Sequence, residues 1–263
     1  MLVVEEIYKS FGAIKALDGV SLAVEQQTIT GLIGPNGSGK TTLFNIISGF
    51  YEKDSGSIRL NGKSIDGLDP YTIVMMGLVR TFQVSMAPAK MTVLENLLLA
   101  SKEQIGERVL NNFLSYRRIS KQEKENLSKA LKIAEMIGLD CLKNEYAGNL
   151  SGGQKKLLSF GRVLMADPDL VLLDEPTAGV NPTLTLELLK VIENARKDLG
   201  KTFLLIEHDM KVISRLCDIV YVLDASMNLA KGTPEEIQKD KKVLQAYLSG
   251  SSGTKRDDQQ EAG

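Results

Sequence analysis

A glycine-rich loop closes on a lysine near the start of this chain, in the segment Gly34-Pro-Asn-Gly-Ser-Gly-Lys-Thr41. Residues 28–33 before it form a short apolar run of the kind found in buried strands, and residues 40–48 have the apolar spacing of a helix that ends at Gly49. Glycines in such a loop let successive backbone N–H groups turn toward phosphate oxygens. A strand, a glycine loop and a helix N-terminus therefore predict a binding site for a nucleoside triphosphate.

This interpretation gives the loop and the first helical turn specific roles. Lys40 would reach the terminal phosphates, and Thr41 would hold Mg²⁺ through its hydroxyl. The expected nucleotide-binding residues are Gly34, Asn36, Gly37, Ser38, Gly39, Lys40, Thr41 and Thr42. Alone, the loop predicts a nucleotide site without specifying a reaction.

Strand-like and helix-like segments alternate over much of the chain. Short β-rich runs separated by glycine extend to about Phe82, with strands expected at 2–7, 19–24, 28–33 and 57–60. Residues 92–136 have a helical pattern. Beyond Ser151 we expect a strand at 170–173, a helix at 182–199, and strands at 202–206 and 219–223. Such alternation predicts an α/β fold with a mainly parallel sheet. A chain of 263 residues fits one globular domain that carries subdomains.

Charge and cysteine content narrow the class of protein. The formal net charge is −1 and the basic residues are dispersed, which argues against a nucleic-acid partner. Cys141 and Cys217 lack metal-ligand spacing, so we expect small buried side chains in a reducing compartment. Residues 1–6 lack the basic segment and following apolar stretch typical of a signal peptide, and no apolar run approaches the roughly 20 residues that span a bilayer. We therefore expect a cytoplasmic protein that would reach a membrane only through a partner.

Two adjacent carboxylates follow the apolar run Leu170-Val-Leu-Leu. Ligands of open α/β sheets bind at the carboxyl ends of the strands, which is where Asp174 and Glu175 would lie. Asp174 suits a Mg²⁺ ligand, directly or through water. Glu175 suits a general base that orients and deprotonates an attacking water.

His208 and Gln83 are further candidates for the reaction. His208 is the only histidine and comes just after the apolar strand 202–206, where it could reach a γ-phosphate and position the attacking water. Gln83 stands where the β-rich pattern gives way to helix, and could sense Mg²⁺ or water. From spacing alone, a capping or surface role for Gln83 is as plausible.

The order of these motifs resembles the nucleotide-binding subunits of ATP-binding cassette (ABC) transporters over nearly the whole chain, to about Leu248. Its most specific part is Leu150-Ser-Gly-Gly-Gln154, which ordinary phosphate-loop enzymes lack. The resemblance implies a P-loop ATPase core with an N-terminal antiparallel β subdomain and an inserted α-helical subdomain. It also implies ATP and Mg²⁺ as ligands, with Thr41, Gln83 and Asp174 at the metal.

The Leu-Ser-Gly-Gly-Gln sequence, called the signature below, implies a dimer. Ser151 and the N–H groups of Gly152 and Gly153 would form a second anion site at a helix N-terminus, followed by Gln154. In the family, this site binds the γ-phosphate of a nucleotide held by the other protomer. Each active site would therefore be completed by a second copy of the chain or by a second ABC ATPase.

Two positions near the nucleotide are assigned by the resemblance alone. Phe11 aligns with the aromatic residue that stacks on adenine, whereas Tyr8 is expected to be an ordinary strand residue. Asn181 stands where the family usually has an aspartate, in the segment Ala178-Gly-Val-Asn181-Pro182. The bridge that this aspartate makes between protomers is therefore not assured here.

The resemblance also divides the chain into parts. We expect one nucleotide-binding domain over residues 1–248, with an ATPase core at about 1–83 and 161–248 and a helical subdomain at about 84–160. Residues 249–263 contain almost nothing to bury and are expected to be a disordered tail.

Several stretches resemble one branch, the ATPases of branched-chain amino acid uptake systems. They are Arg80-Thr-Phe-Gln83, Met91–Leu97, Ala178–Pro182, Ile206–Met210, Gly232–Ile237 and Ala246-Tyr-Leu248, together with the charged helical insertion at 101–132. The implied partners are integral-membrane permeases, which residues 82–100 would meet, and indirectly an extracytoplasmic solute-binding protein. The implied location is the cytoplasmic face of the cell membrane.

Other functions remain open from the sequence. Relatives serve urea or short-amide uptake and lipopolysaccharide export, and some ABC ATPases work on ribosomes or DNA. Ribosomal members generally fuse two cassettes and repair members insert a long coiled coil or zinc hook, none of which this sequence shows. A third alternative is a regulatory subunit that binds ATP without hydrolysing it, which Glu175 and His208 oppose but which the altered Asn181 leaves open.

Overall fold

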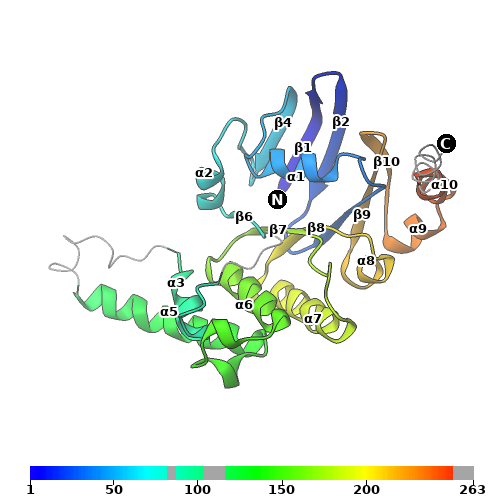
Figure 1. Ribbon diagram of the computed structural model, residues 1–263. Helices are drawn as coiled ribbons and strands as arrows, with labels where there is room; N and C mark the ends of the chain where they lie inside the picture. The colour runs from blue at the N-terminus through cyan, green and yellow to red at the C-terminus, as the bar shows by residue number, and fades with distance from the viewer. Residues whose placement is uncertain (82–86, 103–115, 251–263) are drawn as a thin grey trace, which may run out of the picture. The chain divides into compact units, whose positions relative to one another are not determined.

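The structure is a computed structural model that describes residues 1–81, 87–102 and 116–250 of the chain. It divides into two compact units, shown as ribbons in Figure 1. The first unit contains Met1–Arg80, Leu170–Pro176 and the residues from Gly200 onward, and the second contains Thr81–Asp169 and Thr177–Leu199. Within the described ranges, every helix is too short or too polar to span a lipid bilayer.

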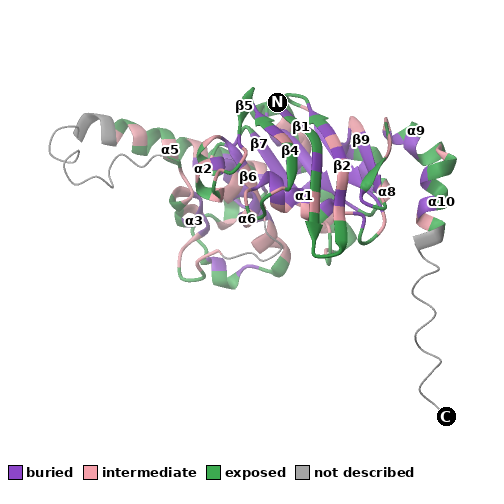
Figure 2. Ribbon diagram, turned by 90° about the horizontal axis from the view of Figure 1, so that it is seen from above, coloured by how far each residue is buried: buried purple, intermediate pink, exposed green. Residues whose placement is uncertain are grey.

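A six-stranded sheet forms the centre of the first unit, with the order β10-β9-β3-β8-β7-β6. Its strands are β3 (Ile29–Ile33), β6 (Leu78–Arg80), β7 (Leu170–Asp174), β8 (Thr202–Ile206), β9 (Ile219–Asp224) and β10 (Met227–Gly232). All neighbours pair in parallel except β10 with β9. β3 and β8 are buried along their whole length, and Figure 2 shows β7 and β9 mainly in purple. Continuous apolar burial is typical of parallel strands covered on both faces, and the predicted parallel sheet is confirmed.

A second sheet of the first unit is antiparallel and has the order β2-β1-β4-β5. Its strands are β1 (Leu2–Phe11), β2 (Ile14–Val24), β4 (Ser55–Leu60) and β5 (Lys63–Ser64). Buried and exposed residues alternate at the start of β1, as expected where one face is covered and the other is open. The predicted N-terminal antiparallel β subdomain is therefore confirmed. β1 and β2 run further than the predicted 2–7 and 19–24, because their ends pair in a hairpin at Phe11 and Ile14.

The helices of the first unit are short. They are α1 (Lys40–Ile47), α2 (Pro70–Met75), α8 (Met210–Leu216), α9 (Pro234–Lys239) and α10 (Lys241–Gly250). α1 forms where predicted because Leu43, Phe44 and Ile47 recur at helical spacing and are buried. Gly49 follows its end with a φ of 76°, a left-handed conformation that glycine adopts readily and that terminates helices.

The second unit is helical. It contains α3 (Val93–Leu99), α5 (Tyr116–Met136), α6 (Gly152–Met165) and α7 (Pro182–Leu199), with 3₁₀ turns at Asp140–Leu142 and Ala147–Asn149. α3 and α6 each begin with a capping box, in which the N-cap side chain and the third residue bond reciprocally. A Cβ on Gly161 would lie 2.7 Å from Ile137 and 3.0 Å from Leu97. The absent side chain of Gly161 thus lets α6 pack closely against its neighbours.

The boundaries between the parts differ from those expected. The second unit extends beyond residue 160 and also takes in 177–199. α6 is one continuous helix through Met165, so it cannot be divided at residue 160, and α7 packs against it. α10 continues to Gly250, two residues into the expected tail. The remaining tail, Gln83, and parts of the segments 82–100 and 101–132 lie outside the described residues.

The two cysteines have different environments. Cys217 is buried as expected, but Cys141 is exposed because it lies in a 3₁₀ turn without buried residues. Burial raises the pKa of the Cys217 thiol, and the charges of Asp218 and Glu207 raise it further.

Since the thiolate is the reacting form, we expect iodoacetamide to alkylate Cys141 in the native protein and Cys217 only after denaturation. Mass spectrometry with Cys141→Ser as control checks this, and equal native labelling of both would contradict the burial.

Candidate functional site

The glycine loop joins the end of β3 to the start of α1, as the sequence predicts. Gly39 has a φ of 101°, and a Cβ there would lie 2.5 Å from the carbonyl oxygen of Ala16 and 2.7 Å from the Leu17 side chain. Only glycine fits both the backbone conformation and the space. The loop therefore passes close against β2 at Gly39.

Lys40 lies inside this loop rather than in solvent. Its Nζ donates hydrogen bonds of 2.9 Å to the carbonyl oxygens of Gly34 and Pro35, and the residue is only 6% exposed. Burial lowers the pKa of the Lys40 ammonium, while the negative charges of Glu175 and Asp174 oppose that shift. Both carboxylates are thus close enough to act on the lysine expected to meet the phosphates.

The loop suits an anion. The Ser38 hydroxyl is buried without a hydrogen-bond partner among the described residues. α1 has neither a side-chain cap nor an acidic residue in its first turn, so the helix end is available to an anion. Asn36, Gly37 and Thr41 are exposed, whereas Gly39 and Thr42 are half-buried. Phosphate oxygens would satisfy both the orphaned hydroxyl and the free helix end.

Residues for a metal ion are present but few. The described residues contain no cluster of three or more His, Cys, Asp or Glu side chains that could hold a metal. Mg²⁺ in nucleotide sites takes one or two protein ligands together with phosphate oxygens and waters. The hydroxyl of Thr41 and the carboxylate of Asp174 fit that limited set, and Mg²⁺ would offset phosphate charge there.

Glu175 and His208 form a direct pair. The Glu175 Oε1 lies 2.9 Å from the His208 Nε2, across 33 positions of sequence. Glu175 has a φ of 47°, and its backbone N–H donates to the Ile206 carbonyl at 3.0 Å. A left-handed conformation is uncommon outside glycine and often marks functional residues. The ends of β7 and β8 thus bring together the proposed base and its positioning histidine.

Phe11 stands at the end of β1 and is 45% exposed. The Tyr51 ring meets it edge-on, with centroids 5.5 Å apart and planes at 73°, and the Lys9 Nζ lies 5.3 Å from its centroid. These neighbours fix the orientation of an exposed aromatic ring, which suits stacking on a base. Sequence spacing gave no signal for Tyr51 or Lys9.

The signature lies in the second unit at the start of α6. The Ser151 Oγ accepts a hydrogen bond of 3.2 Å from the backbone of Gln154, and the Gln154 side chain accepts one of 2.9 Å from Ser151 N. The hydroxyl proton of Ser151 can still be donated to a phosphate. A Cβ on Gly153 would overlap the Leu184 side chain of α7, so a larger residue here would require Leu184 to move.

Asn181 caps a helix of its own chain. Its Oδ1 accepts a hydrogen bond of 2.9 Å from the backbone of Leu184, which caps the start of α7. The nearby Lys156 Nζ donates to the Ala178 carbonyl at 2.6 Å. α6 therefore fixes the position of the segment where the sequence departs from the family pattern.

Sequence reasoning missed two residues that contact the site. Arg80 pairs with Asp174 at 2.8 Å, described further below. Burial raises the pKa of the Tyr247 phenol in α10, and a hydrogen bond from the backbone of Gly34 partly offsets this. The C-terminal helix thus contacts the first glycine of the loop. A tyrosine more than two hundred positions from the loop carries no local signal for this contact.

Comparisons with known proteins agree with this geometry. Residues 17–178 match the family described as ABC transporter, and residues 228–248 match the family described as branched-chain amino acid ATP-binding cassette transporter. The probable branched-chain amino acid transport ATP-binding protein LivG of Archaeoglobus fulgidus is 42% identical over 94% of this chain and 95% of its own. The high-affinity LivG of Escherichia coli K12 is 40% identical over 94% and 97%.

A solved structure shows that the similarity holds for the fold as well as for the sequence. The ADP conformation of an ATP-binding cassette of an ABC transporter superposes with a TM-score of 0.79, at 40% identity, over 94% of this chain and 98% of that one. The predicted family and fold class are confirmed.

Proposed function

The chain belongs to the ABC transporter family of ATP-binding cassettes, and we propose that it hydrolyses ATP to energise branched-chain amino acid uptake through partner permeases. The contact between Glu175 and His208, beside a loop that holds Lys40, carries the ATPase chemistry. The match at residues 228–248 and the similarity to the LivG proteins support the choice of solute.

The residues of the first unit have separate roles in ATP hydrolysis: phosphate binding, proton acceptance and positioning of the water. The loop amides, Ser38 and Lys40 bind the phosphates and offset their charge. Glu175 accepts a proton from water as the water oxygen attacks the γ-phosphorus and the bond to the β–γ bridging oxygen breaks. His208 orients the water and the Glu175 carboxylate relative to each other. Gln83 remains proposed as a sensor of Mg²⁺ or water.

The second unit carries the signature, which we propose as a second phosphate-binding site. We infer that the signature of one chain binds the γ-phosphate on a second chain, so that two chains close on two ATP molecules. Exposed Ser151 and Gly152 at the start of α6 support this role. ATP then favours the closed pair, and its hydrolysis removes that preference. The second chain is another copy or a second ABC ATPase.

Ser151→Ala tests the signature role. We expect turnover to fall by roughly 10²-fold because a donor to the γ-phosphate is lost, while ATP binding to the isolated subunit is unchanged. The variant also loses a helix cap. Thr92→Ala removes the equivalent capping box from α3 and is the matched control. A similar fall in phosphate release for both variants would assign Ser151 to stability alone.

The proposed setting is the cytoplasmic face of a cell membrane, where permeases hold the subunit and a solute-binding protein acts on the far side. Native pull-down from detergent-solubilised membranes, followed by mass spectrometry, tests it. We expect two polytopic permeases and a second cassette ATPase. A single export-type permease would contradict the uptake assignment. Ribosomes or DNA in place of permeases would contradict a transport role.

A further inference from the structure

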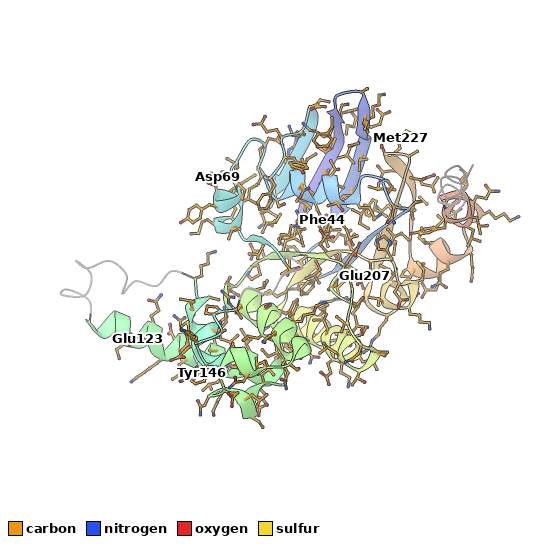
Figure 3. All side chains as sticks on the ribbon, in the orientation of Figure 1. Phe44, Asp69, Glu123, Tyr146, Glu207 and Met227 are labelled. Carbon is orange, nitrogen blue, oxygen red and sulfur yellow. The ribbon has the colours of Figure 1, made fainter. Side chains whose placement is uncertain are left out.

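Arg80 makes a set of contacts at the end of β6 that the reaction described above does not use. Its Nη2 lies 2.8 Å from the Asp174 Oδ2, and the two side chains are only 9% and 14% exposed. Its Nη1 donates to the Asn45 Oδ1 at 2.6 Å and to the Ser48 Oγ at 3.4 Å. The guanidinium carbon lies 5.8 Å from the ring centroid of Phe44, which Figure 3 labels.

These contacts join two parts of the proposed metal site. Asn45 belongs to α1, the helix that begins with Lys40 and Thr41, and Ser48 caps its end. Asp174 ends β7. The planar guanidinium presents its donors in a fixed fork, so one Arg80 side chain bonds to both the helix and the strand. A lysine at this position would keep the positive charge but could not bond to Asn45 and Asp174 with the same fork of donors.

We propose that Arg80 is a positioning residue that holds Asp174 and the Thr41 helix at the spacing Mg²⁺ requires when ATP is bound. Arg80 engages the Oδ2 of Asp174, so the Oδ1 would be the oxygen that binds the cation. The Asn45 contact fixes the arginine itself. The proposal rests on the proposed ATP site, and it deepens it by naming what sets the metal affinity of that site.

The opposite effect is physically possible and makes the proposal testable. Arg80 carries a positive charge beside the carboxylate, so it could simply compete with Mg²⁺ for Asp174. Removing it would then strengthen metal binding. If Arg80 positions the carboxylate instead, removing it weakens metal binding, because residues that orient metal ligands typically contribute about 10-fold to 100-fold to affinity.

Three variants test this: Arg80→Lys, Arg80→Gln and Asn45→Ala. Binding of a fluorescent ATP analogue is measured first in EDTA and then during a Mg²⁺ titration. We expect the affinity in EDTA to stay within about 2-fold of the wild type. The apparent Mg²⁺ affinity should fall roughly 10-fold or more in both Arg80 variants, and less in Asn45→Ala.

The controls separate positioning from folding. Removing one partner of a buried ion pair can destabilise the fold, but Asn45→Ala leaves the Arg80–Asp174 pair in place. Arg59→Gln breaks only an exposed pair with Glu5 and should change neither affinity. Equal losses in EDTA and in Mg²⁺, or unchanged or tighter Mg²⁺ binding, would overturn the proposal. A wild-type protein that binds no ATP under either condition would instead overturn the proposed function.

Discussion

Glu175→Gln is expected to lower ATP turnover by roughly 10² to 10⁴ while ATP binding persists. The amide has the same shape and can keep the contact with His208, but it cannot take a proton from water. Phosphate release and equilibrium binding of labelled ATP measure the two properties separately. Glu25→Gln makes the same chemical change at an exposed turn and should leave both unchanged.

The same variant should also trap the closed pair. Without hydrolysis, bound ATP keeps favouring the sandwich of two chains, so the protein should elute as a dimer from size-exclusion chromatography in the presence of ATP. It should elute as a monomer without nucleotide. Near-normal turnover of Glu175→Gln would remove Glu175 from the role of base.

Lys40→Met should weaken ATP binding and lower kcat/KM by roughly 10² to 10³. The methionine keeps much of the apolar stem, which is buried, but removes the ammonium that would exchange the Gly34 and Pro35 carbonyls for phosphate oxygens. Titration with a fluorescent ATP analogue measures the loss directly.

A control separates this loss from a general effect of charge. Lys63→Met removes an exposed lysine from β5 and should leave ATP affinity unchanged. Thermal unfolding without nucleotide shows whether the Lys40 variant remains folded. If a folded Lys40→Met variant bound ATP as well as the wild type, the loop would not be the phosphate site.

Much of the fold followed from local pattern. α7 and β8 have the predicted bounds of 182–199 and 202–206, because long apolar periodicity and a continuous apolar run are strong signals. α8 and α9 were not predicted, since helices of 7 and 6 residues offer too few turns for periodicity to show. The extent of β1 and β2 depended on their pairing, which local sequence does not encode.

The candidate site was predictable where motifs are linear. The loop around Lys40 and the two carboxylates at the end of β7 were found from residue order alone, and the structure places Glu175 and His208 in contact. Arg80 was missed as a site residue because its partners lie 35 and 94 positions away. Contacts at that separation arise from sheet order and helix packing, so no sequence window contains them.

ATP-driven uptake by the assembled complex is the decisive test of the proposed transport function. The complex that co-purifies with this chain would be reconstituted into proteoliposomes with its solute-binding protein, and uptake of radiolabelled leucine would be followed. We predict accumulation that requires ATP, is competed by unlabelled isoleucine and valine, and is lost with Glu175→Gln. ATP hydrolysis without leucine uptake, or uptake of urea in place of leucine, would contradict the proposed function.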